Sequence, residues 1–536
     1  MYKIRLVKSF NMRSMVIAAL LVLLNSCWVS NEPAALPAMP LISVEFENEI
    51  RNSGIMPVVF RGDGNVSYME GVSGQALDLS HTAKYRKPVV LANDHHSNLT
   101  DYPGITILVW VRLSPDDYSP YTILSQKDEF EDFEPFGWSL TTGVGGSWGW
   151  WISDGIHQNS YRPTVNRQPI NDGEWHLLGF SIDFATKEAR LFYDGINVAI
   201  YSLQHEDLNF FDKPLFLGAD PFSADPVLDT FNGSMDELTV WSRVLSPAQV
   251  DALYRQYREP KQKPITKMPD SLTVMSWNIW GGGMREGRHV GVKRVAEMIK
   301  ASGADIVSMQ ETFASGPLIA DELGFYFYQR SEGLSVLSRY PLGETYNIYR
   351  SRVSGAITIE LPRNNQAVFC PVYLSYLPNS GPFIMSGNAT ADSVVVRELE
   401  TRGAEMRYIV WELQSLVNRN DQVPLILAGD FNSGSHLDWT EANRLNRYNL
   451  VIEYPTTKIL ETAGFVDSYR ELYPNEVTDP GFTWSPRFRE VLHDRVNFIF
   501  YNGSSLEPSW STVIDTHPLA FPSDHAALVT SFKWKK

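Results

Sequence analysis

The chain contains, at residues 424–432, the stretch Pro424-Leu425-Ile426-Leu427-Ala428-Gly429-Asp430-Phe431-Asn432, which decides the fold of its C-terminal half. The apolar run predicts a buried strand, and this strand ends on a carboxylate and an amide. Asp430 and Asn432 are two residues apart, so on an extended chain their side chains project to the same side. Such an ending indicates a functional site at the end of a core strand.

Three more strings in the same half also place oxygen or imidazole groups at the end of apolar runs: Ser276-Trp277-Asn278, Gln310-Glu311 and Ser523-Asp524-His525. Carboxylate and amide oxygens suit a hard cation, and a carboxylate can also handle a water molecule. An imidazole can stabilise developing charge. The four strings together point to the hydrolysis of a phosphate ester.

The elements around these strings follow two hydrophobic periods. Strands are predicted at 273–279, 305–309 and 425–428, and helices between them, one over 292–299 that ends at Gly303 and a longer one over 406–417. This alternation predicts a layered α/β domain. The N-terminal half has short β-branched and aromatic runs, such as 105–113 and 188–193, separated by turn signals, and predicts a β-sandwich. Prolines 260, 264 and 269 mark a linker over 259–270.

The 536 residues and 43% hydrophobic content predict two or three domains with packed cores. The formal net charge of -16 is divided among three regions: residues 1–26 carry +4 (four basic and no acidic), residues 27–267 carry -14 (18 basic and 32 acidic) and residues 268–536 carry -6 (24 basic and 30 acidic). Neither part is a basic body that would grip nucleic acid by bulk electrostatics. Nucleic acid remains possible as a substrate.

The N-terminus is typical of an export signal, with four basic residues before a short apolar run over 15–24. The string Leu24-Asn25-Ser26-Cys27 resembles a bacterial lipobox. The resemblance implies a lipoprotein signal peptide over 1–26, lipidation of Cys27 and a spacer over 27–41. The protein would then be anchored by lipid to a membrane of the bacterial cell envelope, facing the periplasm or on the cell surface. Cys370 would have no disulfide partner and is expected to fill the core.

Residues 42–258 resemble the laminin-G-like, concanavalin A-like jelly-roll family, through strings such as Asp172-Gly173-Glu174-Trp175-His176 and Phe231-Asn232-Gly233-Ser234-Met235-Asp236-Glu237. The resemblance implies a glycan or protein ligand, sometimes with Ca²⁺. Trp148, Trp150 and Trp151 would either stack on sugar rings or pack in the sandwich. The acidic run over 128–134 would either attract a cation or form a solvated loop.

The four strings resemble the endonuclease/exonuclease/phosphatase superfamily, which includes deoxyribonuclease I and inositol polyphosphate 5-phosphatases. The resemblance covers 271–536 and implies a deoxyribonuclease I-like, four-layer α/β sandwich that uses Mg²⁺, with Mn²⁺ possible. It implies that Glu311 holds the metal, with Asn278 beside it. Asp430 would activate water, Asn432 would bind the phosphate, and Asp524 with His525 would stabilise the transition state.

Two positions depart from the common pattern of that superfamily. Tyr376 stands where many members have histidine, and its hydroxyl is expected to donate to the phosphate. Asn497 stands where many have the aspartate that holds the catalytic histidine, so His525 should be a weaker cation. Asp494 offers a carboxylate nearby, but it faces the other way on a regular strand. The sequence leaves both as candidate partners of His525.

The expected function is therefore an exported, membrane-anchored phosphoester hydrolase with an accessory jelly-roll domain. A phosphodiesterase or nuclease and a phosphatase both fit, with a lipid headgroup, an inositol phosphate or nucleic acid as substrate. The alternative is a non-catalytic binding protein with a degenerate hydrolase domain. Asn497 and the missing strand histidine motivate it.

Overall fold

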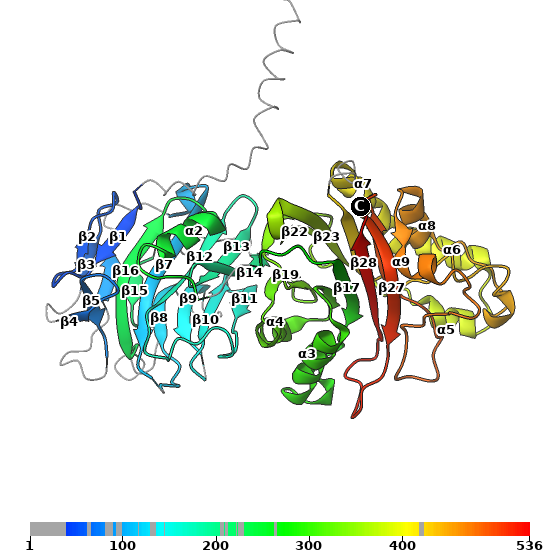
Figure 1. The fold of residues 1–536 in the computed structure, drawn as a ribbon, viewed down its shortest axis with the longest axis horizontal. Helices are drawn as coiled ribbons and strands as arrows, with labels where there is room; N and C mark the ends of the chain where they lie inside the picture. The colour runs from blue at the N-terminus through cyan, green and yellow to red at the C-terminus, as the bar shows by residue number, and fades with distance from the viewer. Residues whose placement is uncertain are drawn as a thin grey trace, which may run out of the picture.

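The computed structural model describes residues 39–535 except for 62–65, 81–88, 93–98, 116, 129–135, 144, 204–207, 209–212, 221, 223–229, 262–264 and 418–422. The chain folds into a jelly-roll β-sandwich followed by a four-layer α/β sandwich, which confirms the predicted fold class (Figure 1). The signal peptide, Cys27, most of the spacer and nearly all of the acidic run over 128–134 lie outside the described residues. In the part of the chain that is described, no helix has the length and apolar character needed to cross a membrane.

Two packed antiparallel sheets make the N-terminal domain, with α2 (Pro247–Tyr254) beside them. The strands of one sheet are, in spatial order, β2 (Arg51–Asn52), β1 (Ile42–Glu45), β16 (Gly233–Trp241), β7 (Gly104–Leu113), β12 (His176–Asp183), β13 (Glu188–Tyr193) and β14 (Ile196–Ser202), with β5 (Gln75–Asp78) and β4 (Ser67–Glu70) joined to β16. Those of the other are β11 (Gln158–Tyr161), β10 (Trp148–Ser153), β9 (Phe136–Thr142), β8 (Thr122–Asp128), β15 (Leu215–Leu217), β6 (Val89–Ala92) and β3 (Val59–Arg61).

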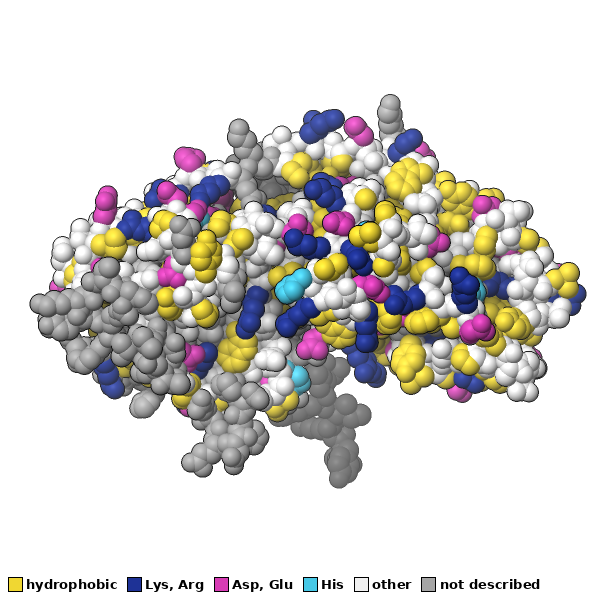
Figure 2. All heavy atoms as spheres, turned by 90° about the horizontal axis from the view of Figure 1, so that it is seen from below, with side chains coloured by type: hydrophobic (Ala, Val, Ile, Leu, Met, Phe, Trp, Pro, Cys, Tyr) yellow, Lys and Arg dark blue, Asp and Glu magenta, His cyan; other side chains and the backbone are white. Residues whose placement is uncertain are grey.

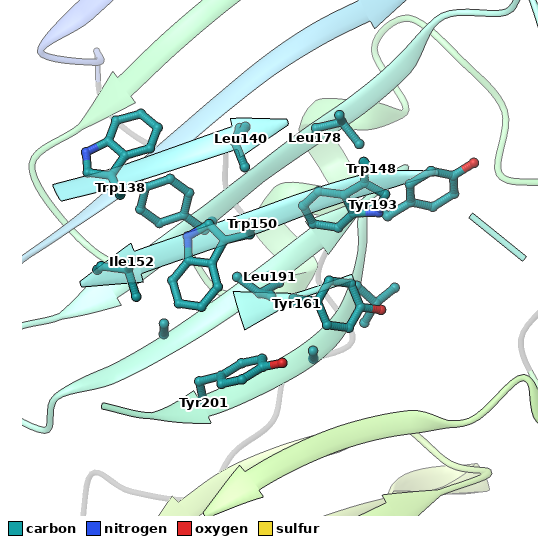
Figure 3. Close-up of a cluster of buried hydrophobic side chains, with 14 of the residues drawn as sticks. Trp138, Leu140, Trp148, Trp150, Ile152, Tyr161, Leu178, Leu191, Tyr193 and Tyr201 are labelled. Carbon is teal, nitrogen blue, oxygen red and sulfur yellow. The ribbon is translucent and has the colours of Figure 1, made fainter. Parts of the chain in front are cut away.

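The aromatic cluster of this domain lies between its sheets. Trp148 and Trp150 are buried in the same core as Trp138 and Tyr201 (Figure 3). Trp148 and Trp150 therefore pack in the sandwich and are not free to stack on sugar rings. Trp151 projects to the other face of β10, half-buried, with the Lys127 ammonium 5.1 Å from its ring centroid.

The C-terminal domain also has two sheets. One contains β19 (Tyr326–Ser331), β20 (Leu334–Ser338), β18 (Ile306–Gln310), β17 (Ser271–Asn278), β28 (Ala527–Trp534) and β27 (Leu506–Ile514). The other contains β21 (Leu342–Tyr346), β22 (Ala356–Leu361), β23 (Asn365–Tyr373), β24 (Leu425–Asp430), β26 (Asn497–Asn502) and β25 (Val466–Asp467). Apolar side chains of the two sheets, such as Val274 and Ile426, meet in one core.

Helices cover the outer faces of both sheets of this domain. On one side lie α3 (Val290–Ser302) and α4 (Gly316–Leu323), whose apolar faces pack on β17 and β18. The other side carries α7 (Arg402–Val417), which packs on β23 and β24, with α5 (Ser380–Met385), α6 (Ala391–Glu400), α8 (Pro455–Thr462) and α9 (Ser468–Leu472) along the same half of the domain. Helix α3 ends at Gly303, as predicted, because Gly303 adopts the left-handed conformation with φ of 70°.

The two domains share one sheet. Strand β14 of the jelly roll pairs in parallel with β19 of the α/β domain, with Ala199 opposite Phe327 and Tyr201 opposite Gln329. The pairing joins their strands into a single 15-stranded sheet that runs across the molecule (Figure 1). The linker at 259–270 is thus a break in the chain's secondary structure, whereas the sheet continues from one domain into the other.

Candidate active site

The four polar strings meet where strand ends of the two sheets converge. Asn278 ends β17 and is paired in parallel register with Gln310, which ends β18. Asp430 ends β24 and lies opposite Asn497, the first residue of β26. Because these ends lie on the same edge of the packed sheets, side chains that are far apart in the sequence come into contact.

Glu311 is held by three donors. The Gly281 amide donates to its Oε2 at 2.8 Å, and the Asn278 amide nitrogen and the Tyr373 hydroxyl donate to its Oε1 at 3.3 and 3.2 Å. Its backbone has a φ of +55°, a conformation that costs free energy in a residue with a side chain and that is concentrated at functional sites. The carboxylate is therefore positioned by both backbone and side-chain constraints.

Asp430 lies fully buried beside Glu311. Its Oδ2 accepts a hydrogen bond from the Asn278 amide nitrogen at 3.1 Å, and its Oδ1 accepts one from the Asn432 amide at 2.9 Å. The His525 Nε2 is 3.8 Å from the Asp430 Oδ2. Burial raises the pKa of Asp430, and the adjacent imidazole opposes that rise. A buried carboxylate with a raised pKa is able to accept a proton from water.

Asn278 connects the two carboxylates through its amide nitrogen. Its carbonyl oxygen accepts a hydrogen bond from the Trp280 amide at 3.0 Å. Its role as a metal neighbour stays a prediction, because the structure directs its nitrogen, and not its oxygen, to Glu311 and Asp430. Asn432 donates from its side chain to the Leu374 carbonyl at 3.0 Å and has a φ of +49°.

Asn497 is the partner of His525. Its Oδ1 lies 2.9 Å from the Nδ1 of the imidazole, and since this oxygen can only accept, Nδ1 carries a proton. Asp494 lies elsewhere, where its carboxylate accepts a hydrogen bond from the Trp439 indole at 2.9 Å and faces the Arg447 guanidinium at 3.5 Å. Of the two partners that the sequence left open, the structure places Asn497 against the histidine.

Asp524 and Tyr376 occupy different surroundings. Asp524 is 8% exposed, its Oδ1 is buried without a hydrogen-bond partner, and burial raises its pKa to about 6, with the charges of Glu311 and Asp430 adding to the rise. Tyr376 is 59% exposed, and among the described residues no partner of its hydroxyl is found. Asp524 thus belongs to the cluster of acidic groups, whereas Tyr376 lies on the surface.

Two residues of the site were not predicted. The Tyr373 hydroxyl donates to Glu311. The Ser523 hydroxyl donates to the backbone carbonyl of Asn278 at 2.6 Å and accepts a hydrogen bond from the backbone amide of His525 at 3.0 Å. Tyr373 ends β23 directly opposite Asp430 in parallel register. The alignment of these two strand ends was the signal that could have identified Tyr373, while the role of Tyr376 stays a prediction.

The donor set fits Mg²⁺ in the way that this ion usually binds proteins. Within the described residues, no three or more His, Cys, Asp or Glu side chains form a complete metal cage. Mg²⁺ does not need one, because it typically takes one or two carboxylates, several waters and a substrate phosphate oxygen. Glu311 provides one carboxylate, and the unpartnered Oδ1 of Asp524 provides a second oxygen in need of a partner.

Comparison with known proteins agrees with the geometry. The profile of the Endonuclease/Exonuclease/phosphatase family matches residues 275–525, and that of the Concanavalin A-like lectin/glucanases superfamily matches residues 87–251. An uncharacterized protein of Caenorhabditis elegans is 30% identical over 258 residues, which span 44% of this chain and 79% of that protein.

Solved structures similar to the chain include an endonuclease/exonuclease/phosphatase of Beutenbergia cavernae (16% identity, 50% of this chain, 72% of that chain, TM-score 0.34). Truncated TDP2 of Caenorhabditis elegans is also similar (18% identity, 49% of this chain, 98% of that chain, TM-score 0.34). So is the catalytic domain of human nocturnin (18% identity, 50% of this chain, 97% of that chain, TM-score 0.35). Through its C-terminal domain, which follows a concanavalin A-like domain, the chain belongs to the Endonuclease/Exonuclease/phosphatase family.

Proposed function

We propose that the protein is a Mg²⁺-dependent phosphoester hydrolase. The observation that supports this most directly is the chain of contacts from Glu311 through Asn278 to Asp430 and on to His525. It brings a metal-ligating carboxylate, a base and an imidazole to one buried point. Phosphoester hydrolysis needs these three groups together.

Asp430 acts as the base in the proposed reaction. It takes a proton from a water molecule as the water oxygen bonds to phosphorus, and the ester oxygen leaves and takes a proton from solvent. Burial raises the pKa of this carboxyl, which makes it a stronger base than an exposed aspartate. His525, with its Nδ1 proton held by Asn497, presents Nε2 to the phosphate oxygens.

The metal would be held by Glu311 with Asp524 beside it. When bound, Mg²⁺ supplies positive charge that polarises the phosphoryl group. Asn432, whose backbone amide donates to Asp430, would contact the substrate phosphate. Mn²⁺ is expected to substitute, because it also prefers oxygen ligands.

The proposal extends to the location of the enzyme. The signal-like N-terminus and the lipobox-like string at Cys27 support an exported, lipid-anchored protein of the bacterial cell envelope. The jelly-roll domain would bind a glycan or a protein. Any such ligand must use surfaces other than Trp148 and Trp150, because both side chains are buried.

The test is an assay of the purified, lipid-free protein against 4-nitrophenyl phosphate, bis(4-nitrophenyl) phosphate and plasmid DNA, with Mg²⁺ or with EDTA. Activity is expected with Mg²⁺ only, and Asp430→Ala should lower kcat by about 10²–10⁴-fold, the usual contribution of a general base. The exposed Asp392 on α6 supplies the control, Asp392→Ala, which should leave kcat unchanged. Absence of metal-dependent turnover would favour a binding protein with a degenerate hydrolase domain.

A further inference from the structure

A cavity of about 420 Å³ lies beside the reaction centre. Two residues, Asn432 and Trp484, border both the cavity and the reaction centre. Asn432 follows Asp430, and the Trp484 ring packs on the His525 ring with 4.8 Å between their centroids. Its volume is within the range of pockets that bind small organic groups. The cavity therefore lies next to the point where a phosphate would be bound.

The cavity wall is unsuited to a second phosphate. Of the described residues that line it, none is Lys or Arg, and three are carboxylates: Glu398, Glu490 and Asp494. The described residues of the wall therefore provide no cationic side chain that could bind a second phosphate. The cavity therefore disfavours an anionic group.

The two buried carboxylates of the wall are already satisfied by the protein. Glu398 is bound by the Arg402 guanidinium at 2.7 Å and by the hydroxyls of Ser380 and Ser433 at 3.0 and 2.9 Å. Asp494 is bound by the Trp439 indole at 2.9 Å and faces the Arg447 guanidinium at 3.5 Å. With Arg402 on Glu398 and Arg447 on Asp494, these two carboxylates leave little net charge for a cationic ligand to neutralise. Pro382, Met385 and Leu492 provide apolar surface in the same wall, so the cavity suits an uncharged group.

Cationic side chains lie instead near Trp280. Trp280 belongs to the loop whose backbone amide at Gly281 donates to Glu311. The guanidiniums of Arg285 and Arg487 lie 5.2 and 4.9 Å from the Trp280 ring centroid, and the next residue, Gly281, donates to Glu311. Strand β17, which leads to this loop, points to the lower side of the molecule in Figure 1. Figure 2 shows Lys and Arg side chains gathered across the middle of that lower face. The surroundings of the reaction centre are thus asymmetric in charge.

We infer that the substrate is a phosphodiester that places an uncharged ester group, about the size of a nucleoside, in the cavity beside Asn432 and Trp484. This rests on the proposed hydrolase function and adds to it a choice between classes of substrate. A phosphomonoester of a polyphosphorylated ring would direct phosphates to the carboxylates of the wall. An uncharged group fills the cavity, and any further anionic group extends toward Arg285, because the Arg487 guanidinium is paired with Glu286 at 2.7 Å.

Three diesters with the same leaving group test the inference: methyl 4-nitrophenyl phosphate, thymidine 5′-(4-nitrophenyl phosphate) and the 3′-phosphorylated form of the latter. We expect kcat/KM for the thymidine ester to exceed that for the methyl ester by about tenfold to a hundredfold, since filling a pocket gives discrimination of this order. The added 3′-phosphate should remove most of that preference.

A matched pair of variants locates the effect. Met385 lines the cavity and is 39% exposed, so Met385→Trp can obstruct the cavity without disturbing a core. Val396, 51% exposed on α6 and outside the cavity wall, supplies the control Val396→Trp. Met385→Trp should abolish the preference for the thymidine ester over the methyl ester, while Val396→Trp should leave that preference intact.

The outcomes separate the two proposals. Equal kcat/KM for the methyl and thymidine esters, a preference that survives Met385→Trp, or hydrolysis of monoesters only would overturn the inference and leave the hydrolase function standing. If none of the diesters or 4-nitrophenyl phosphate is turned over with Mg²⁺, the hydrolase function itself fails.

Discussion

At the scale of single residues, Asn497 determines how the imidazole of His525 is held. An amide oxygen fixes the tautomer as a carboxylate would, but it adds no negative charge to favour the imidazolium. The site therefore retains the geometry of a supported histidine with less electrostatic support. Asn497 Nδ2 is buried without a partner, which shows that the residue is used for its oxygen.

Substitutions at Asn497 and Asp494 should have different effects. Asn497→Asp is expected to extend activity to higher pH, because a carboxylate 2.9 Å from Nδ1 favours the charged ring. Asp494→Asn should leave the shape of the pH profile unchanged and should act instead on KM, since Asp494 lines the cavity. Profiles of kcat and kcat/KM against pH measure both effects. Equal displacement of the two profiles would contradict the assignment of Asn497 as partner.

Asp236, in the jelly roll, makes stability depend on pH. Burial raises its pKa to about 7 in the folded protein, whereas an aspartate in an unfolded chain has a pKa of about 3.9. The folded state thus binds this proton more tightly. Its contribution to the free energy of unfolding is full below about pH 4 and is lost as the pH rises to about 7.

Asp236→Asn should remove that contribution to the pH dependence. Urea unfolding at pH 4, 5.5 and 7 measures it, with the exposed Asp392→Asn as control. If Asp236→Asn and the parent protein lose stability equally between pH 4 and 7, the assignment is wrong.

Much of the site could be predicted from single residues, because each of its chief groups follows a recognisable apolar run. Glu311, Asp430 and His525 meet as such runs implied. What could not be predicted depended on contacts between strands. The choice between Asn497 and Asp494 depends on how β26 enters its sheet, and the contact of Tyr373 with Glu311 depends on which residue of β23 is the last to pair with β24. Local sequence does not determine either register.

At the scale of elements, the pairing of β14 with β19 holds the two domains together. Phe327 on β19 is fully buried, and its ring centroid lies 5.8 Å from that of Tyr201 on β14. Polar contacts flank this pair, including Gln329 to Asn159 at 3.0 Å and Arg330 to Ser202 at 3.0 Å. Hairpins and helices were predictable from their own residues, but this strand pair joins segments more than a hundred residues apart and leaves no local signal.

Phe327→Ala should destabilise the protein by about 3–5 kcal/mol, because removing a buried ring loses its burial and leaves a cavity. Leu519→Ala, at a side chain that is 78% exposed, is the control and should stay within about 0.5 kcal/mol. Urea denaturation measures both. A loss below about 1 kcal/mol at Phe327 would show that this strand pair contributes little to stability.

At the scale of the whole molecule, the shared sheet predicts that both domains unfold together. Asp321 of the α/β domain is 2% exposed and accepts a hydrogen bond from Gln168 of the jelly roll at 2.9 Å, so neither partner can leave without exposing the other. The contacts between the domains are thus part of a continuous core rather than a surface interface.

Denaturation followed by two probes tests this. Near-ultraviolet circular dichroism reports chiefly the jelly roll, which holds six of the eight buried tryptophans of the described residues, and catalytic activity reports the α/β domain. The two transitions should coincide within error, as expected of one cooperative unit. Activity that persists after the jelly-roll signal is lost would contradict the prediction.

The shared sheet also determines how this chain can be inherited and recombined. A gene fragment that begins at the proline-containing linker would encode a hydrolase domain whose strand β19 has an open edge, and the fragment before it would leave β14 equally bare. Unpaired edges of this kind recruit strands from other molecules. Exchange of either half for an unrelated module therefore demands a compensating change at that edge.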